Sequence, residues 1–280
     1  MAKDKMAMTG ELAEAEATGE LATIYEELRV FCGVPYVSSL QRFLATMPGA
    51  LEYAWAALRP AFLDGRLPET AWRLAGGIEA APLPPLSAPA LTLLGVDAEG
   101  RAAIRNICDN FVRVAPVNLL FAACIERLLQ GSKPRGGAAA KDAWTPPAML
   151  APMGPMVDPA AAPADVGAVL MRLAGEIDGK PFVAGLYRLI ARWPGYLAHV
   201  ATLIEPLLKD DAERSRRGAI AVRIVAAAGD ILAGLPMLDG AHAPPTPEQA
   251  RAIAAAIHTY RVTSPEMIVF GTLLRDSLPA

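Results

Sequence analysis

The sequence predicts an all-α protein in which one helical module occurs twice and forms a pseudo-twofold dimer within a single chain. Apolar residues recur with a helical period, and no alternating apolar and polar run of strand length stands between turn signals. Residues 45–60 read ATMPGALEYAWAALRP, and residues 191–206 read ARWPGYLAHVATLIEP. A segment rich in Pro, Gly and Ala separates the two copies. We therefore expect two similar helical bundles and no sheet.

The first helix is predicted from one apolar face, formed at helical spacing by Leu21, Ile24, Tyr25, Leu28 and Phe31. Later helices are predicted to begin where proline can occupy a first-turn position, at Pro48, Pro116, Pro194, Pro247 and Pro265. The start at Thr246-Pro247-Glu248 has a threonine cap, a proline at the first helical position and an acid in the first turn.

The two copies align at a fixed offset in residue number, and this offset becomes slightly larger farther along the chain. At a shift of 146, Val34-Pro35-Tyr36-Val37 falls on Lys180-Pro181-Phe182-Val183, and Pro48-Gly49 falls on Pro194-Gly195. At a shift of 149, the matched pairs are Phe111 with Tyr260, Pro116 with Pro265, and Phe121 with Phe270. The predicted organisation is an arm at 1–18, a first repeat at 19–130, a linker at 131–164 and a second repeat at 165–280. Trp144 in the linker is expected to pack on the surface of a repeat.

Composition and charge exclude several classes of function. Of the 280 residues 53% are hydrophobic and 20% are charged, but no window supplies the roughly 18 uninterrupted apolar residues of a membrane span. The first 20 residues lack the apolar core of a signal peptide, so a cytoplasmic protein is expected. The net charge is −3, and no Lys/Arg cluster is long enough to follow a nucleic-acid backbone. The expected form is a monomer or a homodimer.

The common catalytic motifs are absent. His199, His242 and His258 have no metal-binding spacing, and there is no nucleophile elbow or phosphate-binding glycine loop. No metal and no organic cofactor are predicted. Cys32, Cys108 and Cys124 form no CxxC pair and are expected to be buried free thiols. The missing pair also argues against the thiol chemistry of the similar small helical modules of the alkylhydroperoxidase type.

The repeated phrases resemble a known family. Residues 19–60, with Val34-Pro35-Tyr36 and Leu44-Ala45-Thr46-Met47-Pro48-Gly49, are similar to the first half of the group I (DehI-type) 2-haloacid dehalogenases. Trp193-Pro194 of the second copy matches as well, and the resemblance runs from about residue 12 to 275. It implies an all-helical pseudo-dimer with its active site between the two halves. It also implies direct attack of an activated water on C2 of a 2-halo acid, with inversion and without a covalent ester.

The resemblance implies that an Asp activates the water, an Asn helps to hold it, and aromatic residues enclose the halogen. The position of the Asn is Ala115 here, and that of the Asp is Leu186, or Ala184 if a gap is allowed. The corresponding positions of the other repeat are Ser264 and Leu40. The enclosing aromatic is Tyr36, with Phe182 as its repeat partner. None of the replacements is a carboxylate, which argues against dehalogenation.

We therefore expect a protein that binds a small organic acid in a cavity between its halves, lined by Tyr36, Phe182, Arg113, Asn118, Tyr187 and Ser264. Arg113 is suited to hold a carboxylate through a charge-assisted bond, or to cap a helix end. Ser264 stands before Pro265, and the favoured interpretation of Ser264 is an N-cap. One alternative is a non-catalytic module that binds a small ligand or a protein. A second is a cofactor-independent hydrolase with a relocated base, for which Glu266 in the first turn after Pro265 is favoured over Asp109.

Overall fold

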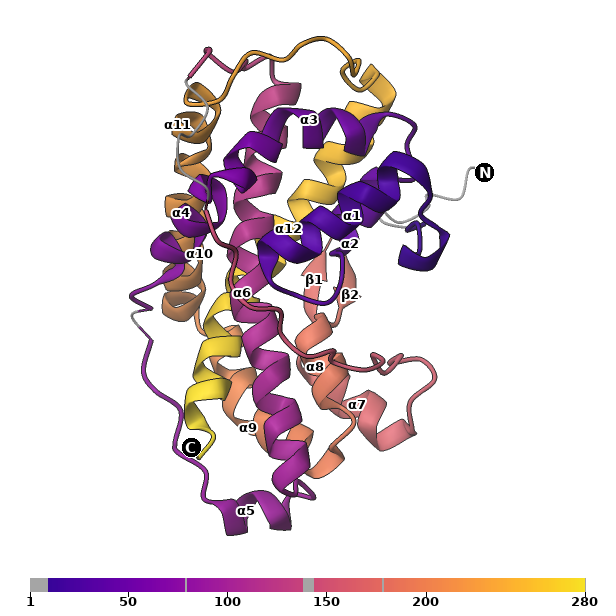
Figure 1. Cartoon of the computed structure of the whole chain (residues 1–280). Coiled ribbons are helices and arrows are strands. Elements are labelled where there is room, and N and C mark those ends of the chain that lie inside the picture. The colour runs from indigo at the N-terminus through magenta and orange to yellow at the C-terminus, as the bar shows by residue number, and fades with distance from the viewer. Residues whose placement is uncertain (1–9, 79, 138–143, 178, 280) are drawn as a thin grey trace. The chain divides into compact units, whose positions relative to one another are not determined.

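The computed structural model describes residues 10–78, 80–137, 144–177 and 179–279, and it confirms the all-α fold (Figure 1). A short 3-10 helix, Glu14–Glu16, comes first. The helices are α1 (Gly19–Cys32), α2 (Ser39–Leu44), α3 (Ala50–Leu63), α4 (Arg66–Ala75), α5 (Ala88–Leu93), α6 (Ala98–Leu129), α7 (Ala164–Arg172), α8 (Gly185–Ile190), α9 (Pro194–Lys209), α10 (Asp211–Ala226), α11 (Ala228–Ala233) and α12 (Pro247–Ser277).

One small hairpin contradicts the expectation that no sheet is present. Strands β1 (Gly175–Ile177) and β2 (Lys180–Phe182) pair antiparallel, with Gly175 opposite Phe182. Gly179 has φ 73°, a left-handed conformation that suits a tight hairpin turn. Each strand has three residues, too few to produce an alternating pattern in the sequence.

The predicted helix starts are correct at two prolines. Pro194 is the first residue of α9, and Pro247 is the first residue of α12. The Thr246 cap is confirmed, because the Gln249 backbone N–H donates to Thr246 Oγ1 at 3.3 Å. Gln249 Oε1 in turn accepts from the Thr246 N–H at 2.8 Å, which completes a capping box. At Pro48 the helix α3 begins two residues later, after Gly49.

The predicted starts at Pro116 and Pro265 are wrong, because both prolines lie inside long helices, α6 and α12. A proline inside a helix removes one backbone hydrogen bond and costs about 3 kcal/mol. Every residue from 114 to 125 of α6 is buried, and this burial offsets the cost. Ser264 is consequently not an N-cap: it lies in the middle of α12 and is 3% exposed.

The structure divides into two compact units that are not continuous along the chain. Unit 1 comprises Met1–Gly76, Pro116–Met149 and Ala221–Arg261; unit 2 comprises Gly77–Ala115, Leu150–Ile220 and Val262–Ala280. Three of the boundaries therefore fall inside helices, in α6 before Pro116, in α10 after Ile220 and in α12 after Arg261.

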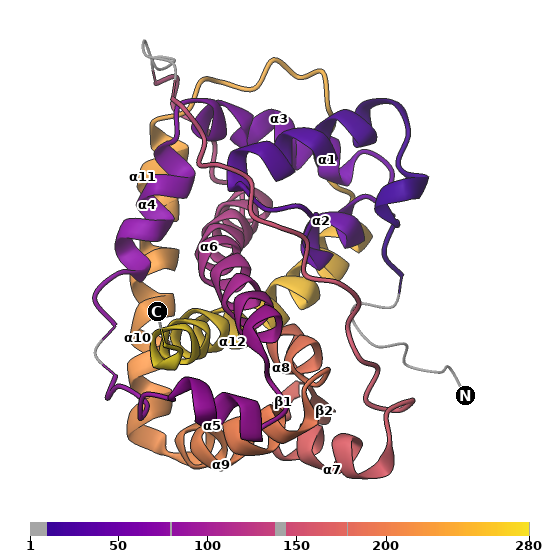
Figure 2. The same cartoon turned by 60° about the horizontal axis from the view of Figure 1, so that its bottom comes forward.

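Each unit has its own apolar core. In unit 1, α1 packs on α3 and α3 on α4, and the rings of Trp55 and Phe62 have centroids 5.0 Å apart. In unit 2, α9 packs against α7 and α8, with the hairpin next to α8 (Figure 2). Its largest fully buried side chains include Tyr187, Tyr196 and Phe270. The three cysteines are free and buried, as expected.

Candidate functional site

Unit 1 contains a buried chain of two amides and a hydroxyl. Gln41 on α2 donates from Nε2 to Asn118 Oδ1 at 3.0 Å. Asn118, two residues past Pro116 on α6, donates from Nδ2 to Ser38 Oγ at 2.6 Å. Gln41 and Asn118 are 3% and 4% exposed. The remaining carbonyl, Gln41 Oε1, is buried and has no hydrogen-bond partner among the described residues.

Two tyrosines belong to the same unit. The Tyr260 hydroxyl accepts from the Leu40 backbone N–H at 2.6 Å. The Tyr36 hydroxyl is buried, and the described part of the chain gives it no hydrogen-bond partner. Burial raises the pKa of Tyr36 far above its ordinary value, and the nearby Cys32 and Tyr260 add to the effect. Tyr36 is therefore neutral at physiological pH and can donate a hydrogen bond.

Unit 2 contains a second polar cluster, formed by Tyr187 on α8, Arg217 on α10 and Glu266 on α12. Burial raises the pKa of Glu266 to about 7, although the Tyr187 hydroxyl and the Arg217 guanidinium both act to lower it. Tyr187 is fully buried, and its hydroxyl makes no hydrogen bond of standard geometry within the described chain. Burial raises the pKa of Tyr187 well above its ordinary value, and the Glu266 carboxylate raises it further.

Arg217 is held from two sides. Its guanidinium carbon lies 5.0 Å from the centre of the Phe270 ring, and Nη1 donates to the Leu207 carbonyl at 3.1 Å. The residue is 7% exposed, and burial lowers its pKa while Glu266 and Tyr187 oppose this. A buried guanidinium fixed in this way is suited to stabilise a carboxylate.

The two clusters fall at corresponding places in the sequence. Gln41 and Tyr187 are 146 positions apart, the shift that relates the repeats. Each interacts with the long helix close to its internal proline, Gln41 with Asn118 and Tyr187 with Glu266, although the shift of 149 carries Asn118 onto Met267 and not onto Glu266. The duplication itself stays a prediction.

The hydrogen bonds described above do not include Phe182, Arg113 or Ser264. Phe182 ends β2 and is 37% exposed. Arg113 lies inside α6 and has interactions of its own, so the alternative that it caps a helix end is wrong. Ala115 and Leu186 are 5% and 0% exposed. The predicted cavity between the repeats draws on residues of both units and stays a prediction.

Sequence reasoning singled out Asn118, Tyr187 and Glu266 but left Gln41 and Arg217 out of the predicted site. Gln41 could have been found from Tyr187 through the shift of 146. Arg217 lies in a segment of mixed charge, which is typical of a solvent-exposed helix face. Its signal was the helical spacing of the buried positions Glu213, Arg217, Ile220 and Ile224, which puts it on the inner face of α10.

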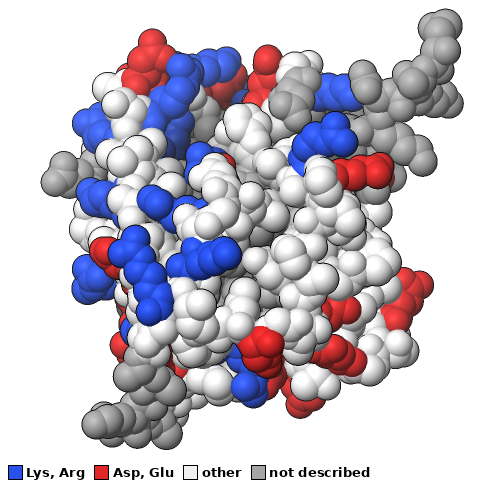
Figure 3. Space-filling view, turned by 90° about the horizontal axis from the view of Figure 1, so that it is seen from above, with Lys and Arg blue, Asp and Glu red and all other residues white. Residues whose placement is uncertain are grey.

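The surface offers little that identifies a partner. The face shown in Figure 3 carries Lys and Arg side chains as well as Asp and Glu side chains. Within the described ranges, no helix is long and apolar enough to cross a membrane. The same residues contain no group of three or more His, Cys, Asp or Glu side chains placed to hold a metal ion.

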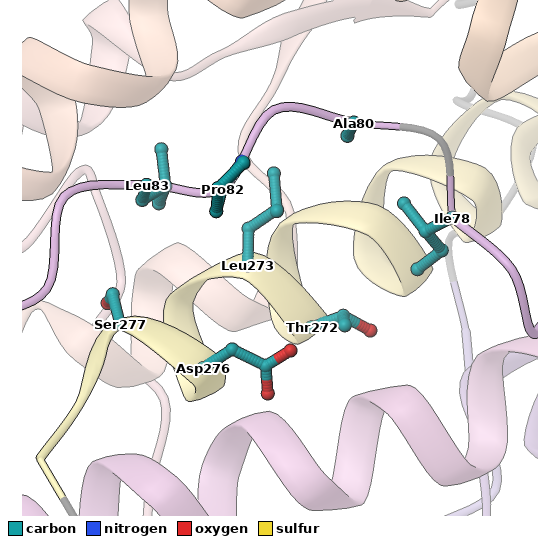
Figure 4. Close-up of a pocket in the computed structure, with 8 residues that line it drawn as sticks. All are labelled: Ile78, Ala80, Pro82, Leu83, Thr272, Leu273, Asp276 and Ser277. Carbon is teal, nitrogen blue, oxygen red and sulfur yellow. The ribbon is translucent and has the colours of Figure 1, made fainter.

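A shallow pocket of about 170 Å³ lies in unit 2, away from the predicted residues. Leu273 of α12 points toward Pro82 of the extended segment that precedes α5 (Figure 4). The backbone N–H of Leu86 in this segment donates to the Ser277 carbonyl at 2.8 Å. The pocket thus lies where an extended segment crosses the end of α12.

Comparison with known proteins gives relatives of one kind. No model of a known protein family matches the chain. A configuration-inverting 2-haloacid dehalogenase of Alcaligenes xylosoxydans xylosoxydans is 27% identical over 234 residues, which cover 81% of this chain and 77% of the relative. An (R)-2-haloacid dehalogenase of Pseudomonas putida is 26% identical over 231 residues, covering 76% of this chain and 73% of that protein.

Solved structures of D-2-haloacid dehalogenase share the fold. One, in complex with L-LA, has a TM-score of 0.74 at 22% identity and covers 99% of both chains. A mutant in complex with D-2-CPA has a TM-score of 0.72 at 20% identity, covering 99% of this chain and 98% of the other. Sequence and fold together make this chain a homologue of the group I, configuration-inverting 2-haloacid dehalogenases, the family that its repeated phrases resemble.

Proposed function

We propose that this protein binds a small organic acid and has lost the family's way of activating water. The observation that carries the proposal is the pair of polar clusters, each with a buried oxygen, Gln41 Oε1 or the Tyr187 hydroxyl, that has no hydrogen bond of standard geometry among the described residues, in a homologue of 2-haloacid dehalogenases. Buried polar groups nearly always have a partner, supplied by protein, water or ligand. One of the solved neighbours is a complex with L-LA, which supports a small acid as the ligand class.

The proposed loss of the family's reaction rests on Ala115 and Leu186. The resemblance places the water-holding Asn and the water-activating Asp at these positions, and neither replacement can accept a proton. Losing a general base commonly costs about 10²–10⁴ in rate. We therefore expect binding of 2-chloropropionate with little or no chloride release.

Thermal unfolding with matched ligands tests the binding proposal. A ligand at 100 times its Kd stabilises the folded state by about 2.7 kcal/mol. We expect 2-chloropropionate and propionate to raise the melting temperature in a concentration-dependent way. Propionamide, which has the same size but no carboxylate, should leave it unchanged. Equal shifts with acid and amide, or no shift with either, would contradict the proposal.

A hydrolytic dehalogenase with Glu266 as its base is the second candidate, favoured by the pKa of about 7 at this carboxyl. A base with a pKa near the working pH combines a useful deprotonated fraction with good proton affinity. In this reaction water attacks C2 of the 2-halo acid, and the carbon–halogen bond breaks with its electron pair leaving on the halide. Glu266 takes the proton of the water, and the products are a 2-hydroxy acid of inverted configuration and a halide ion.

Chloride release against pH distinguishes the two candidates. If Glu266 is the base, the rate rises with pH as the carboxyl loses its proton and levels off above about 7. Glu266→Gln should then abolish the release, while Asp109→Asn should leave it unchanged. An absence of chloride release from wild-type protein that binds the acid supports the first candidate and removes the second.

A further inference from the structure

The carboxylate of Glu14 connects three parts of unit 1. Glu14 lies in the short 3-10 helix before α1, and its Oε2 accepts from Arg29 Nη1 of α1 at 2.7 Å. Its Oε1 accepts from the backbone N–H of Val37 at 2.9 Å, in the loop of residues 33–38 that joins α1 to α2. Both carboxylate oxygens therefore have a donor, and hydrogen bonds to a charged acceptor are stronger than those between neutral groups.

The residue after Val37 begins the buried amide chain of unit 1. Ser38 Oγ accepts from Asn118 Nδ2 at 2.6 Å, and Asn118 Oδ1 accepts from Gln41 Nε2 at 3.0 Å. The hydrogen bond from the Val37 N–H to Glu14 holds the backbone directly before Ser38. Because hydrogen bonds weaken steeply when their geometry changes, a shift of the loop at Val37 would disturb the whole chain.

The arm segment (residues 10–16) has attachments to unit 1 besides Glu14. The Leu12 backbone N–H donates to the Arg42 carbonyl at 3.0 Å, and the Tyr25 hydroxyl donates to the Leu12 carbonyl at 3.3 Å. Glu11 forms an ion pair with Arg42. The arm segment is thus held against α1 and α2 by several groups, and Glu14 is the one that reaches the loop between them.

The second repeat has a comparable attachment without an acid at the matching place. The carbonyl of Arg188, the counterpart of the arginine that binds the arm segment in unit 1, accepts from the Val157 N–H at 3.1 Å. The residues 145 and 146 positions after Glu14 are Pro159 and Ala160. Attachment of this kind therefore does not require the acid, which leaves the hydrogen bond to the loop as its distinct contribution in unit 1.

We propose that Glu14 is a positioning residue, which fixes the loop of residues 33–38 and, through Ser38, the side chains of Asn118 and Gln41. Tyr36 belongs to the same loop. For its consequence in binding, the inference rests on the proposed function: an acid that binds at this cluster must order the loop when Glu14 is lost, and the affinity falls by that cost.

Two substitutions of Glu14 separate the hydrogen bond from the rest of the side chain. Glu14→Ala removes the acceptor of the Val37 N–H and the ion pair with Arg29. Glu14→Gln keeps an oxygen that can accept from the same N–H, without the charge. Glu16→Ala is the matched control, because Glu16 is an exposed acid of the same 3-10 helix.

Hydrogen exchange and NMR spectra of the ligand-free protein test the positioning directly. In Glu14→Ala the Val37 amide should exchange about 10-fold or more faster, since it loses a charge-assisted acceptor. The side-chain amide signals of Asn118 and Gln41 should shift in the same variant. Glu14→Gln should exchange at a rate between wild type and Glu14→Ala, and Glu16→Ala should match the wild type.

Unchanged exchange at Val37 or unshifted side-chain amide signals in Glu14→Ala would overturn the proposal. Should Glu14→Ala fail to fold, Glu14→Gln still decides: its neutral acceptor should raise the exchange rate of Val37 a few-fold, and an unchanged rate would overturn the proposal.

Calorimetric titration with propionate tests the consequence for binding. We expect Glu14→Ala to bind propionate about 10-fold more weakly than the wild type, and Glu16→Ala to bind it equally well. Wild-type affinity in Glu14→Ala, together with faster exchange at Val37, would overturn the role of Glu14 in binding. If the wild type does not bind propionate, the proposed function falls, whereas the exchange rates and amide signals still decide whether Glu14 positions the cluster.

Discussion

The carboxyl group of Glu266 lies one residue past Pro265 in α12, where burial raises its pKa to about 7 from an ordinary value of 4.5. The folded state therefore favours the protonated form more than the unfolded chain does. This contribution to stability is fully present below pH 4.5 and is lost as the pH rises through about 7. Arg217 and the Tyr187 hydroxyl limit the size of the shift, since both favour the charged carboxylate.

Replacing Glu266 with Gln should remove this pH dependence. At pH 5 the variant and the wild type should have similar free energies of unfolding. At pH 8 the variant should be more stable by about 2–3 kcal/mol, because it does not bury a charge. Urea unfolding at both pH values measures the difference, with Glu26→Gln at an exposed position of α1 as the matched control. A variant that is less stable than wild type at pH 8 would show that the carboxylate is well paired in the folded state.

The Gln41–Asn118 hydrogen bond gives a second prediction at this scale. Gln41→Leu and Asn118→Leu should each destabilise the protein by about 1–3 kcal/mol, because each leaves a buried amide without its partner. The double variant should cost less than the sum of the two, since both amides are then gone. Free energies of unfolding in urea for the three variants test the coupling. Additive losses would show that the two side chains do not interact.

The polar residues could be predicted from the sequence only where a repeat or a proline marked their position. Asn118 and Glu266 follow internal prolines, and Tyr187 follows the second copy of the family phrase. The carboxyl pKa of Glu266 could not be predicted, because the dipole argument for an acid after proline assumes a helix start. Its burial depends on α8 and α10, which are distant in sequence.

At the scale of elements, the chain after α6 is attached to α4 by Trp144. The Trp144 ring lies 6.3 Å from that of Trp72, and its Nε1–H donates to Glu69 at 2.8 Å. Gly65, the N-cap of α4, has φ 76°, and a β-carbon there would lie 2.5 Å from the Trp144 ring. The expected packing of Trp144 is thus confirmed, and it depends on a glycine at the start of α4.

Gly65→Ala should therefore destabilise the protein for two reasons, the left-handed backbone and the clash with Trp144. Gly240→Ala is the matched control, because Gly240 has φ 81° and no atom within 4 Å of the added carbon. We expect the control to cost roughly 1–2 kcal/mol and Gly65→Ala to cost more. Thermal or urea unfolding of both variants measures the difference. Equal losses would mean that Trp144 moves away without cost.

Helix starts were predictable where side chains cap them and not where a proline stands alone. At Thr246 the cap, the proline and the glutamine agree, and the helix begins there. At Pro116 and Pro265 the local sequence resembles a start, yet each helix continues through its proline, and around Pro116 every residue from 114 to 125 is buried. One-dimensional patterns do not contain this tertiary contribution.

At the scale of the whole molecule, each compact unit combines segments from both predicted repeats. The first repeat contributes residues 77–115 to unit 2, and the second contributes 221–261 to unit 1. Adding the shifts of 146 and 149 to residues 77–115 gives residues 223–264. These nearly coincide with residues 221–261, the segment that the second repeat contributes to unit 1. We propose that the two copies of a duplicated module exchange equivalent segments, as in a domain-swapped dimer, which would produce this match.

The exchange predicts that neither repeat is stable alone. A fragment of residues 1–137 lacks 221–261, including Tyr260, whose hydroxyl accepts from the Leu40 backbone in unit 1. We expect this fragment and the fragment 144–280 each to show little cooperative unfolding by circular dichroism, and a mixture of the two to recover it. Cooperative unfolding of the first fragment by itself would contradict the exchange.

The most direct test of small-acid binding is a crystal structure of the protein with 2-bromopropionate, in which the anomalous scattering of bromine locates the halogen. We predict a bromine peak still bonded to the acid, with the ligand's polar atoms against the Gln41–Asn118 cluster or the Tyr187–Arg217–Glu266 cluster. A crystal with no bromine peak at either cluster, at a ligand concentration that saturates the thermal shift, would contradict the proposed function.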